Sequence, residues 1–283
     1  MESSAREISS SGVLPAPAGR RVIYRHTLLV RVTHWINALC FILLLMSGLQ
    51  IFNAHPALYL GAQSTFDNPL VALTAQQEND GPIKGVTKIF GRSFTTTGIL
   101  GASRDESGQF VERGFPRWMT IPSYQDLATG RRWHFFFAWL LVGNGAVYLA
   151  NLFARRRLWD FVPQRREWRA LPASVLAHAR LRFHRSERYN VLQKLAYLSA
   201  IVAFPILALA GLTMSPAMDA AFAWLPVLFG GRQSARTIHF VLAFSLLGFV
   251  IVHVIMVLVS GFRDNMVSMI TGRYAVEDDR HDA

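Results

Sequence analysis

The sequence alternates between long apolar runs and polar, arginine-rich stretches. Four of the apolar runs are at least 21 residues long and lack the polar face that a surface helix of a soluble protein shows. A helix of about 20 apolar residues can cross the hydrocarbon core of a bilayer. The pattern therefore predicts four membrane-spanning helices, at Leu28–Phe52, Trp133–Phe153, Val191–Thr213 and Thr237–Gly261.

Lys and Arg residues are distributed unequally between the two sides that these spans define. The side that carries both termini has nineteen, and the opposite side has ten. Because cytoplasmic segments are enriched in Lys and Arg, both termini are expected in the cytoplasm. The predicted fold is an all-α integral membrane protein with a four-helix transmembrane bundle. It comprises a tail (1–27), the membrane domain (28–261) with a long periplasmic loop (54–132) and a basic cytoplasmic loop (154–190), and a second tail (262–283).

The segments outside the spans carry weaker signals. The polar tail 1–27 is expected to be disordered, and the loop 54–132 shows no sustained periodicity of either kind. The stretch 216–229 is apolar but too short to cross, so it is expected at the outer interface. The stretch 165–185 is basic and amphipathic, which favours a topology signal and attraction to anionic lipids of the inner leaflet over a specific partner site; no nucleic acid partner is expected.

Composition narrows the function classes further. The chain is 52% hydrophobic and 17% charged, whereas soluble proteins carry nearer 25% charge, so a soluble enzyme is not expected. Cys40 is its single cysteine, so no intrachain disulfide can form. A single cysteine also excludes covalently attached haem of the c type and iron–sulfur clusters, which need several thiolates.

Four of the nine histidines lie within the predicted spans, where an ionisable residue is a functional candidate. His239 and His253 are fourteen residues apart on one helix, so they share a face and differ in depth by about 21 Å. His134 begins its span on the outer side, and His34 lies near the inner end of the first span. Depth alone therefore pairs His134 with His239 (the outer pair) and His34 with His253 (the inner pair). The alternative is that these histidines are hydrogen-bonding contacts between helices.

Two imidazole pairs stacked across a membrane suit two haems b, because haem iron accepts two axial imidazoles. Two histidines alone do not complete a tetrahedral zinc site. Gly48 and Gly145 fall on the histidine faces of their helices and are candidates for the haem slot, or for close helix packing. Arg132 and Arg236 flank the outer pair and are candidates for haem propionates, or for interfacial anchoring. The predicted bundle thus encloses two haems.

These residues resemble a known family. The motifs RVTHWINA (31–38), RRWHFFFAW (131–139) and YNVLQKLAY (189–197), with RTIHF and IVHVIM around His239 and His253, are similar to the bacterial dihaem cytochrome b superfamily. That superfamily includes the membrane subunits of nickel–iron hydrogenases and respiratory formate dehydrogenases, and the thiosulfate-reductase-type subunit is the most similar. The resemblance implies the same histidine pairing and a place in the bacterial inner membrane.

The resemblance also implies a quinone site at the start of the third span. Asn190, Gln193 and Lys194 form a polar cluster there and can hydrogen-bond a quinone carbonyl. The alternative is a helix start with an anchoring lysine. In this interpretation the chain carries electrons between the quinone pool and a periplasmic redox partner, expected to be a molybdopterin oxidoreductase docked on the loop 54–132, and has no catalytic residue of its own.

Two other functions stay open from the sequence. One is a self-contained membrane oxidoreductase in which the outer haem meets a small species such as superoxide, steered by an arginine rim at Arg131, Arg132, Arg232 and Arg236. The other is a transporter or assembly factor without redox chemistry, in which the histidines are structural.

Overall fold

A computed structural model describes residues 20–77, 81–180 and 190–277. The expectations for residues 1–19, 181–189 and 278–283 therefore lie outside the described residues. Four long helices dominate the described chain, and each is long and apolar enough to cross a membrane. They are α1 (Leu28–Phe52), α2 (Leu127–Ala154), α5 (Val191–Thr213) and α8 (Arg232–Val259).

Helices α1 and α5 have the predicted bounds, whereas α2 and α8 begin several residues earlier than predicted. Asp126 caps α2, because its carboxylate accepts hydrogen bonds from the backbone N–H groups of Ala128 and Thr129 at 2.9 and 3.1 Å. The helix therefore starts at its cap and not at the first residue of the apolar run. Helix α8 starts after Gly231, whose φ of 110° suits only glycine.

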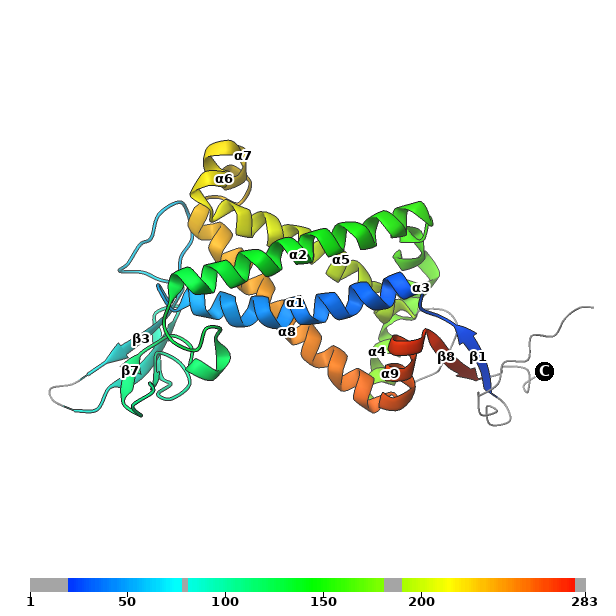
Figure 1. The fold of residues 1–283 in the computed structure, drawn as a ribbon, viewed down its shortest axis with the longest axis horizontal. Helices are drawn as coiled ribbons and strands as arrows, with labels where there is room; N and C mark the ends of the chain where they lie inside the picture. Colours follow the sequence, from blue (N-terminus) through cyan, green and yellow to red (C-terminus); the bar gives the residue numbers. More distant parts are fainter. Residues whose placement is uncertain (1–19, 78–80, 181–189, 278–283) are drawn as a thin grey trace, which may run out of the picture.

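The long helices pack as two pairs, α1 with α2 and α5 with α8 (Figure 1). A polar contact joins the first pair inside the span. The Asn144 side chain on α2 donates hydrogen bonds to the Thr33 carbonyl at 2.8 Å and to Asn37 Oδ1 at 2.6 Å, both on α1. Asn144 and Thr33 are buried, so these bonds satisfy polar groups that lipid could not. Helices α1 and α2 are thereby held in register.

The described residues between α1 and α2 (54–77 and 81–126) contain six strands, and we call this part of the chain the β module. The prediction of an all-α protein is therefore wrong here. The module's four-stranded antiparallel sheet has the order β2-β3-β4-β5, and β6 and β7 form a hairpin. The short helix η1 (Arg117–Met119) follows the hairpin. The strands are β2 (Ala57–Leu58), β3 (Val71–Gln76), β4 (Lys84–Ile89), β5 (Arg92–Thr95), β6 (Ala102–Arg104) and β7 (Phe110–Glu112).

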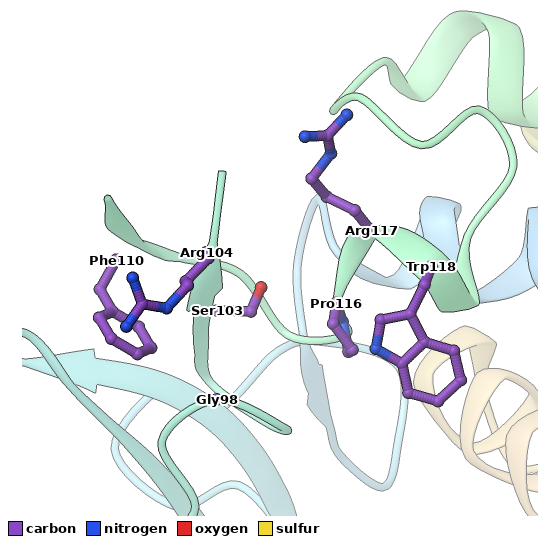
Figure 2. A pocket seen from close by; sticks show the side chains of 7 residues that line it. All are labelled: Gly98, Ser103, Arg104, Phe110, Pro116, Arg117 and Trp118. Carbon is purple, nitrogen blue, oxygen red and sulfur yellow. The ribbon is translucent and has the colours of Figure 1, made fainter. Parts of the chain in front are cut away.

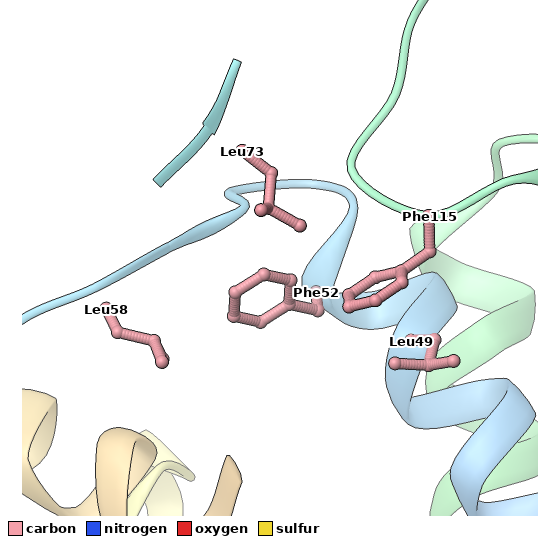
Figure 3. Packing of buried hydrophobic residues seen from close by; sticks show 5 residues of the cluster. All are labelled: Leu49, Phe52, Leu58, Leu73 and Phe115. Atoms are coloured by element: carbon pink, nitrogen blue, oxygen red, sulfur yellow. The ribbon is translucent and has the colours of Figure 1, made fainter. Parts of the chain in front are cut away.

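A hydrophobic cluster fixes the β module to the ends of the long helices (Figure 3). Phe52 on α1 lies with its ring centroid 4.7 Å from that of Phe240 on α8 and 5.8 Å from that of Phe115 in the β module. This cluster joins both helix pairs and the β module, so the module is part of one packed unit. Its buried members are Leu49, Phe52, Leu58, Leu73 and Phe115.

Near the β module, the stretch 216–229 forms two short helices, α6 (Pro216–Ala221) and α7 (Trp224–Leu228), neither long enough to cross a membrane (Figure 1). The opposite end of the bundle carries five further elements (Figure 1). These are η2 (Leu158–Phe161), α3 (Arg165–Arg169), α4 (Leu171–Ala179), α9 (Phe262–Thr271) and a strand pair.

The strand pair joins the two ends of the described chain. Strand β1 (Arg20–Tyr24) pairs antiparallel with β8 (Arg273–Glu277). The expectation of a disordered tail through residue 27 is therefore wrong for residues 20–24. Beside the pair, the Arg31 guanidinium and the Trp35 indole on α1 donate hydrogen bonds to the last carbonyls of α9, which lack partners within that helix.

Candidate cofactor site

The structure places the four span histidines in two pairs at the two ends of α8. His134 on α2 faces His239, with ring centroids 6.2 Å apart and an interplanar angle of 61°. His34 on α1 faces His253, with centroids 6.3 Å apart and an angle of 64°. Helix α8 supplies one histidine to each pair, and the fourteen residues between them separate the pairs by about 21 Å along the helix. The outer pair lies toward the β module and the inner pair toward the chain termini.

The spacing within each pair suits a metal between two imidazoles. An imidazole nitrogen lies about 2 Å from a bound transition metal, and the ring centroid lies about 1.1 Å behind the nitrogen. Two imidazoles on opposite sides of one iron thus have centroids about 6 Å apart, as both pairs have. Over the described ranges, no group of three or more His, Cys, Asp or Glu side chains converges, so a tetrahedral zinc site has no ligand set there. The donor chemistry fits haem iron.

Hydrogen bonds to Nδ1 orient both histidines of the outer pair. The Leu207 carbonyl lies 2.9 Å from His239 Nδ1 and can only accept, so Nδ1 carries the proton. The Ser47 hydroxyl donates to the Leu43 carbonyl at 2.6 Å and lies 3.1 Å from His134 Nδ1, so it accepts from that nitrogen. Both rings therefore keep the Nε2 lone pair for a ligand. Metal-binding histidines are held in this way.

Two glycines make room for the outer imidazoles. A Cβ at Gly48 on α1 would lie 3.3 Å from Cε1 of His134, and a Cβ at Gly211 on α5 would lie 3.2 Å from Cε1 of His239. Each glycine also lies four residues after the residue whose carbonyl its histidine contacts, Leu44 for His134 and Leu207 for His239. Because a glycine has no side chain, nothing at that position covers the carbonyl. Gly48 was predicted from the sequence, whereas Gly211 was missed. Gly145 faces open space, because a Cβ there would meet no heavy atom within 4 Å. Such space is compatible both with a haem slot and with a surface that faces lipid.

The chain has relatives among known proteins. Residues 25–272 match the sequence profile of the family described as prokaryotic cytochrome b561. The chain belongs to that family. It is also 28% identical over 231 residues to the "Putative protein-methionine-sulfoxide reductase subunit YedZ1" of Azospira oryzae, a match that covers 81% of this chain and 87% of the relative.

Membership in the cytochrome b561 family fixes the general class of the protein. The family binds haem b, and this member is a multi-pass protein of the bacterial inner membrane with a role in membrane electron transfer. The prediction of a cytochrome b superfamily member is confirmed. A pair of facing imidazoles within an apolar bundle fits the ligand requirement of haem b.

The inner pair of this cytochrome is supported differently from the outer one. Its rings pack against aromatic neighbours, since Phe249 stacks on His253 at 6.2 Å and Trp35 lies edge-on to His34 at 5.4 Å. Trp35 also donates a hydrogen bond to the Met269 carbonyl on α9, which ties the start of α1 to α9. Aromatic packing, and the hydrogen bond that fixes Trp35 to α9, support the inner pair.

The two predicted propionate arginines have different surroundings. Arg236 is half-buried, donates a hydrogen bond to the His55 carbonyl, and lies over the Phe52 ring at 5.3 Å. Burial and the nearby Arg236 charge also lower the pKa of His55. Arg132 is exposed on the first turns of α2. Arg236 thus lies one helical turn from His239 with part of its guanidinium already engaged.

The predicted quinone residues form a helix start. Asn190 is the N-cap of α5, and its Oδ1 accepts a hydrogen bond from the Gln193 N–H at 2.8 Å while Gln193 Oε1 accepts from the Asn190 N–H at 3.1 Å. Lys194 pairs with Glu167 of α3 at 2.8 Å. The hydrogen bond from Lys194, followed by that from the Gln164 N–H, lowers the pKa of Glu167. The capping box leaves the Asn190 side-chain NH₂ as the donor outside the cap.

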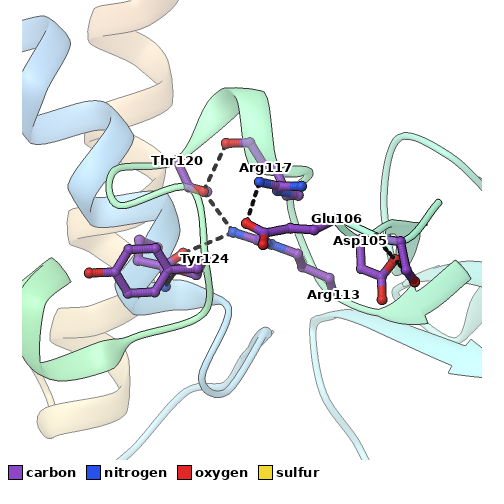
Figure 4. A network of polar contacts seen from close by, with 8 residues as sticks. Asp105, Glu106, Arg113, Arg117, Thr120 and Tyr124 are labelled. Carbon is purple, nitrogen blue, oxygen red and sulfur yellow. Dashed lines mark hydrogen bonds and ion pairs between the residues drawn. The ribbon is translucent and has the colours of Figure 1, made fainter. Parts of the chain in front are cut away.

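The β module contains a buried arginine that was not predicted from the sequence (Figure 4). Arg113 is 5% exposed and donates hydrogen bonds to Gln50 Oε1 of α1, to Thr120 Oγ1 and to the Phe115 carbonyl, at 3.1, 2.8 and 3.0 Å. Gln50 in turn donates to the Tyr124 carbonyl at 2.8 Å. No local sequence pattern distinguishes Arg113 from the other loop arginines, because its burial depends on packing against α1.

The β module also carries a cavity of about 220 Å³ between the β6–β7 hairpin and η1 (Figure 2). Arg104 stacks on Phe110 on one side of it at 4.9 Å, and Trp118 lies on the other with 75% of its surface exposed. The buried Ser103 hydroxyl lines the cavity, and no hydrogen-bond partner is found for it among the described residues.

Proposed function

We propose that this chain is a membrane electron-transfer subunit that binds two haems b, one between His134 and His239 and one between His34 and His253. The observation that carries the proposal is the spacing of the two imidazole pairs, 6.2 and 6.3 Å, at two levels of one helix. A bound haem b supplies one-electron chemistry, with a potential tuned by its ligands and surroundings. The protein positions the ligands and excludes water.

Each element of the bundle has a role in this proposal. Nδ1 hydrogen bonds hold the outer imidazoles and leave the Nε2 lone pairs for a ligand. Gly48 and Gly211 let these rings approach their helices, and Gly145 leaves space on the face of α2 that bears His134. Arg236, one turn outward from His239, and Arg132 are the proposed propionate contacts. The nineteen basic residues on the side of the termini favour a cytoplasmic location for the inner pair.

The proposed electron partners lie at opposite ends of the bundle. At the outer end we assign a catalytic oxidoreductase subunit of the molybdopterin class, docked on the β module. The name of the Azospira oryzae relative, a subunit of a reductase, supports such an assembly. Exposed Trp118 and the neighbouring cavity support a docking role for the module. At the inner end we assign quinone exchange beside Asn190, Gln193 and Lys194, with the Asn190 NH₂ as the donor.

A self-contained oxidoreductase acting on superoxide is less well supported. The proposed arginine rim is engaged in the protein itself, since Arg232 donates a hydrogen bond to the Met214 carbonyl at 2.6 Å and Arg131 lies over the Phe135 ring at 5.5 Å. Arg236 contacts the His55 carbonyl. A folded module over this end also has no role in binding a small anion.

Haem stoichiometry tests the proposal directly. A pyridine haemochrome assay on the purified chain, normalised by amino-acid analysis, is expected to give about two haems b for each chain, one for each imidazole pair. The same preparation in proteoliposomes is expected to be reduced by a quinol. A ratio near one or zero contradicts the two-site assignment, and two haems that quinol does not reduce contradict the quinone part alone.

A further inference from the structure

The guanidinium of Arg113 is buried beside the outer pair without a carboxylate. It is 5% exposed, and over the described residues its contacts are an amide oxygen, a hydroxyl and a carbonyl. Neighbouring acids are engaged elsewhere: Glu106 pairs with Arg117 at 2.6 Å, and exposed Glu112 accepts a hydrogen bond from the Ala75 N–H. Burying a cation costs free energy that hydrogen bonds to its donors offset only in part, so an arginine buried without a carboxylate leaves an uncompensated positive charge inside the protein.

The contacts of Gln50 place this charge close to the outer pair. Gln50 lies three residues after Ser47 on α1, and Ser47 contacts His134. A Cβ at Gly130, one turn before His134 on α2, would lie 2.9 Å from Gln50 Cγ. Gln50 therefore sits between α1 and α2 about 5 Å outward from the His134 contact. Its Oε1 accepts the hydrogen bond from Arg113.

We infer that Arg113 is a fixed positive charge, held in the β module, that raises the reduction potential of the outer haem. This inference rests on the proposed two-haem function. Reduction adds an electron to the iron, so a nearby buried cation stabilises the reduced form, and low solvent exposure limits the screening of that charge. The inner pair lies about 21 Å further along α8, so Arg113 acts mainly on the outer haem. Arg113 is thus a tuning residue and not a ligand.

Three variants of the haem-loaded protein separate charge from structure. Arg113→Gln removes the charge, Arg113→Lys keeps it without the guanidinium fork, and Arg117→Gln removes an arginine of the same loop whose side chain is 31% exposed and paired with Glu106. Potentiometric titration of the haem absorbance, with the outer component identified by its loss in His134→Ala, measures the reduced-to-oxidised ratio of each haem at one ambient potential. Thermal unfolding is followed in parallel.

In Arg113→Gln the ratio for the outer haem is expected to fall several-fold while that of the inner haem is unchanged. Arg113→Lys is expected to keep the outer ratio near wild type although it unfolds at a lower temperature, and Arg117→Gln is expected to change neither ratio. The inference is overturned if Arg113→Gln matches Arg117→Gln, if Arg113→Lys lowers the ratio as Arg113→Gln does, or if both Arg113 variants lose the outer haem. A wild-type protein without two haems refutes the proposed function itself.

Discussion

Replacing Gly211 by alanine places a methyl group against the imidazole of His239. The added Cβ would lie 3.2 Å from Cε1 and 3.3 Å from Nδ1 of that ring, a few tenths of an ångström inside ordinary van der Waals contact. The ring cannot move freely, because Nδ1 donates a 2.9 Å hydrogen bond to the Leu207 carbonyl on the same helix as the methyl group. Relieving the contact thus stretches the bond that orients the ligand.

The size of the effect follows from these contacts. Overpacking a close-packed site costs about 1–3 kcal/mol, and weakening the orienting hydrogen bond adds about 1 kcal/mol. Alanine is favoured over glycine in a helix by about 0.5–1 kcal/mol, which offsets part of that cost. The net loss of about 2 kcal/mol corresponds to outer-haem binding weaker by about 30-fold. Gly48→Ala is expected to have a smaller effect, because its Cβ would lie 3.3 Å from Cε1 of His134 and 3.6 Å from Nδ1.

Haem retention during competition with a haem-scavenging protein measures this loss, with the reduced α band reporting each component. Gly143→Ala is the matched control, since Gly143 is exposed on a membrane-spanning helix with nothing within 4 Å of its added Cβ. Gly143 lies nine residues after His134, on the opposite face of α2. Equal retention in Gly211→Ala and Gly143→Ala would refute the role of Gly211 as the clearance for a ligand ring.

Alanine at His134 or His239 is expected to remove the outer haem alone, and alanine at His34 or His253 the inner haem alone; a shared spectral loss between His134→Ala and His253→Ala, seen by absorbance, would contradict the pairing. Asn190→Ala removes both the α5 cap, worth about 1 kcal/mol, and the proposed quinone donor. Asn190→Asp keeps the cap acceptor and removes the NH₂ donor, so it is expected to weaken quinone turnover in proteoliposomes several-fold with normal haem content. Unchanged turnover in Asn190→Asp places the quinone elsewhere.

The histidine pairs could be predicted from the sequence, because the spacing of residues along an α-helix fixes both the face of the helix on which a side chain lies and its depth in the membrane. Fourteen residues return His253 to the face of His239, and the alternating direction of the spans sets the depth of His34 and His134. The ends of the spans were harder to predict where a helix continues into polar residues. Arg131 and Arg132 interrupt the apolar run, yet α2 begins at Leu127 because Asp126 caps it.

The β module could not be predicted from the sequence, for a physical reason. Its strands are two to six residues long, and β4 buries the three consecutive residues Gly85, Val86 and Thr87, so no alternation of period two appears. Gly211 and Arg113 were missed for related reasons. Gly211 lies on the one predicted span without a histidine. Arg113 stands out only through its hydrogen bond to Gln50, which lies 63 residues earlier in the chain.

The pairing of β1 with β8 has a consequence for biosynthesis. Strand β1 is synthesised before the first span, whereas β8 follows the last span and α9, so the two strands can pair only after all four spans have been synthesised. His34 lies close after β1, and His253 lies before α9. A nascent chain that stops before Arg273 therefore contains all four histidines but cannot yet form the β1–β8 pair, so the strand pair forms only after every histidine of both pairs has been synthesised.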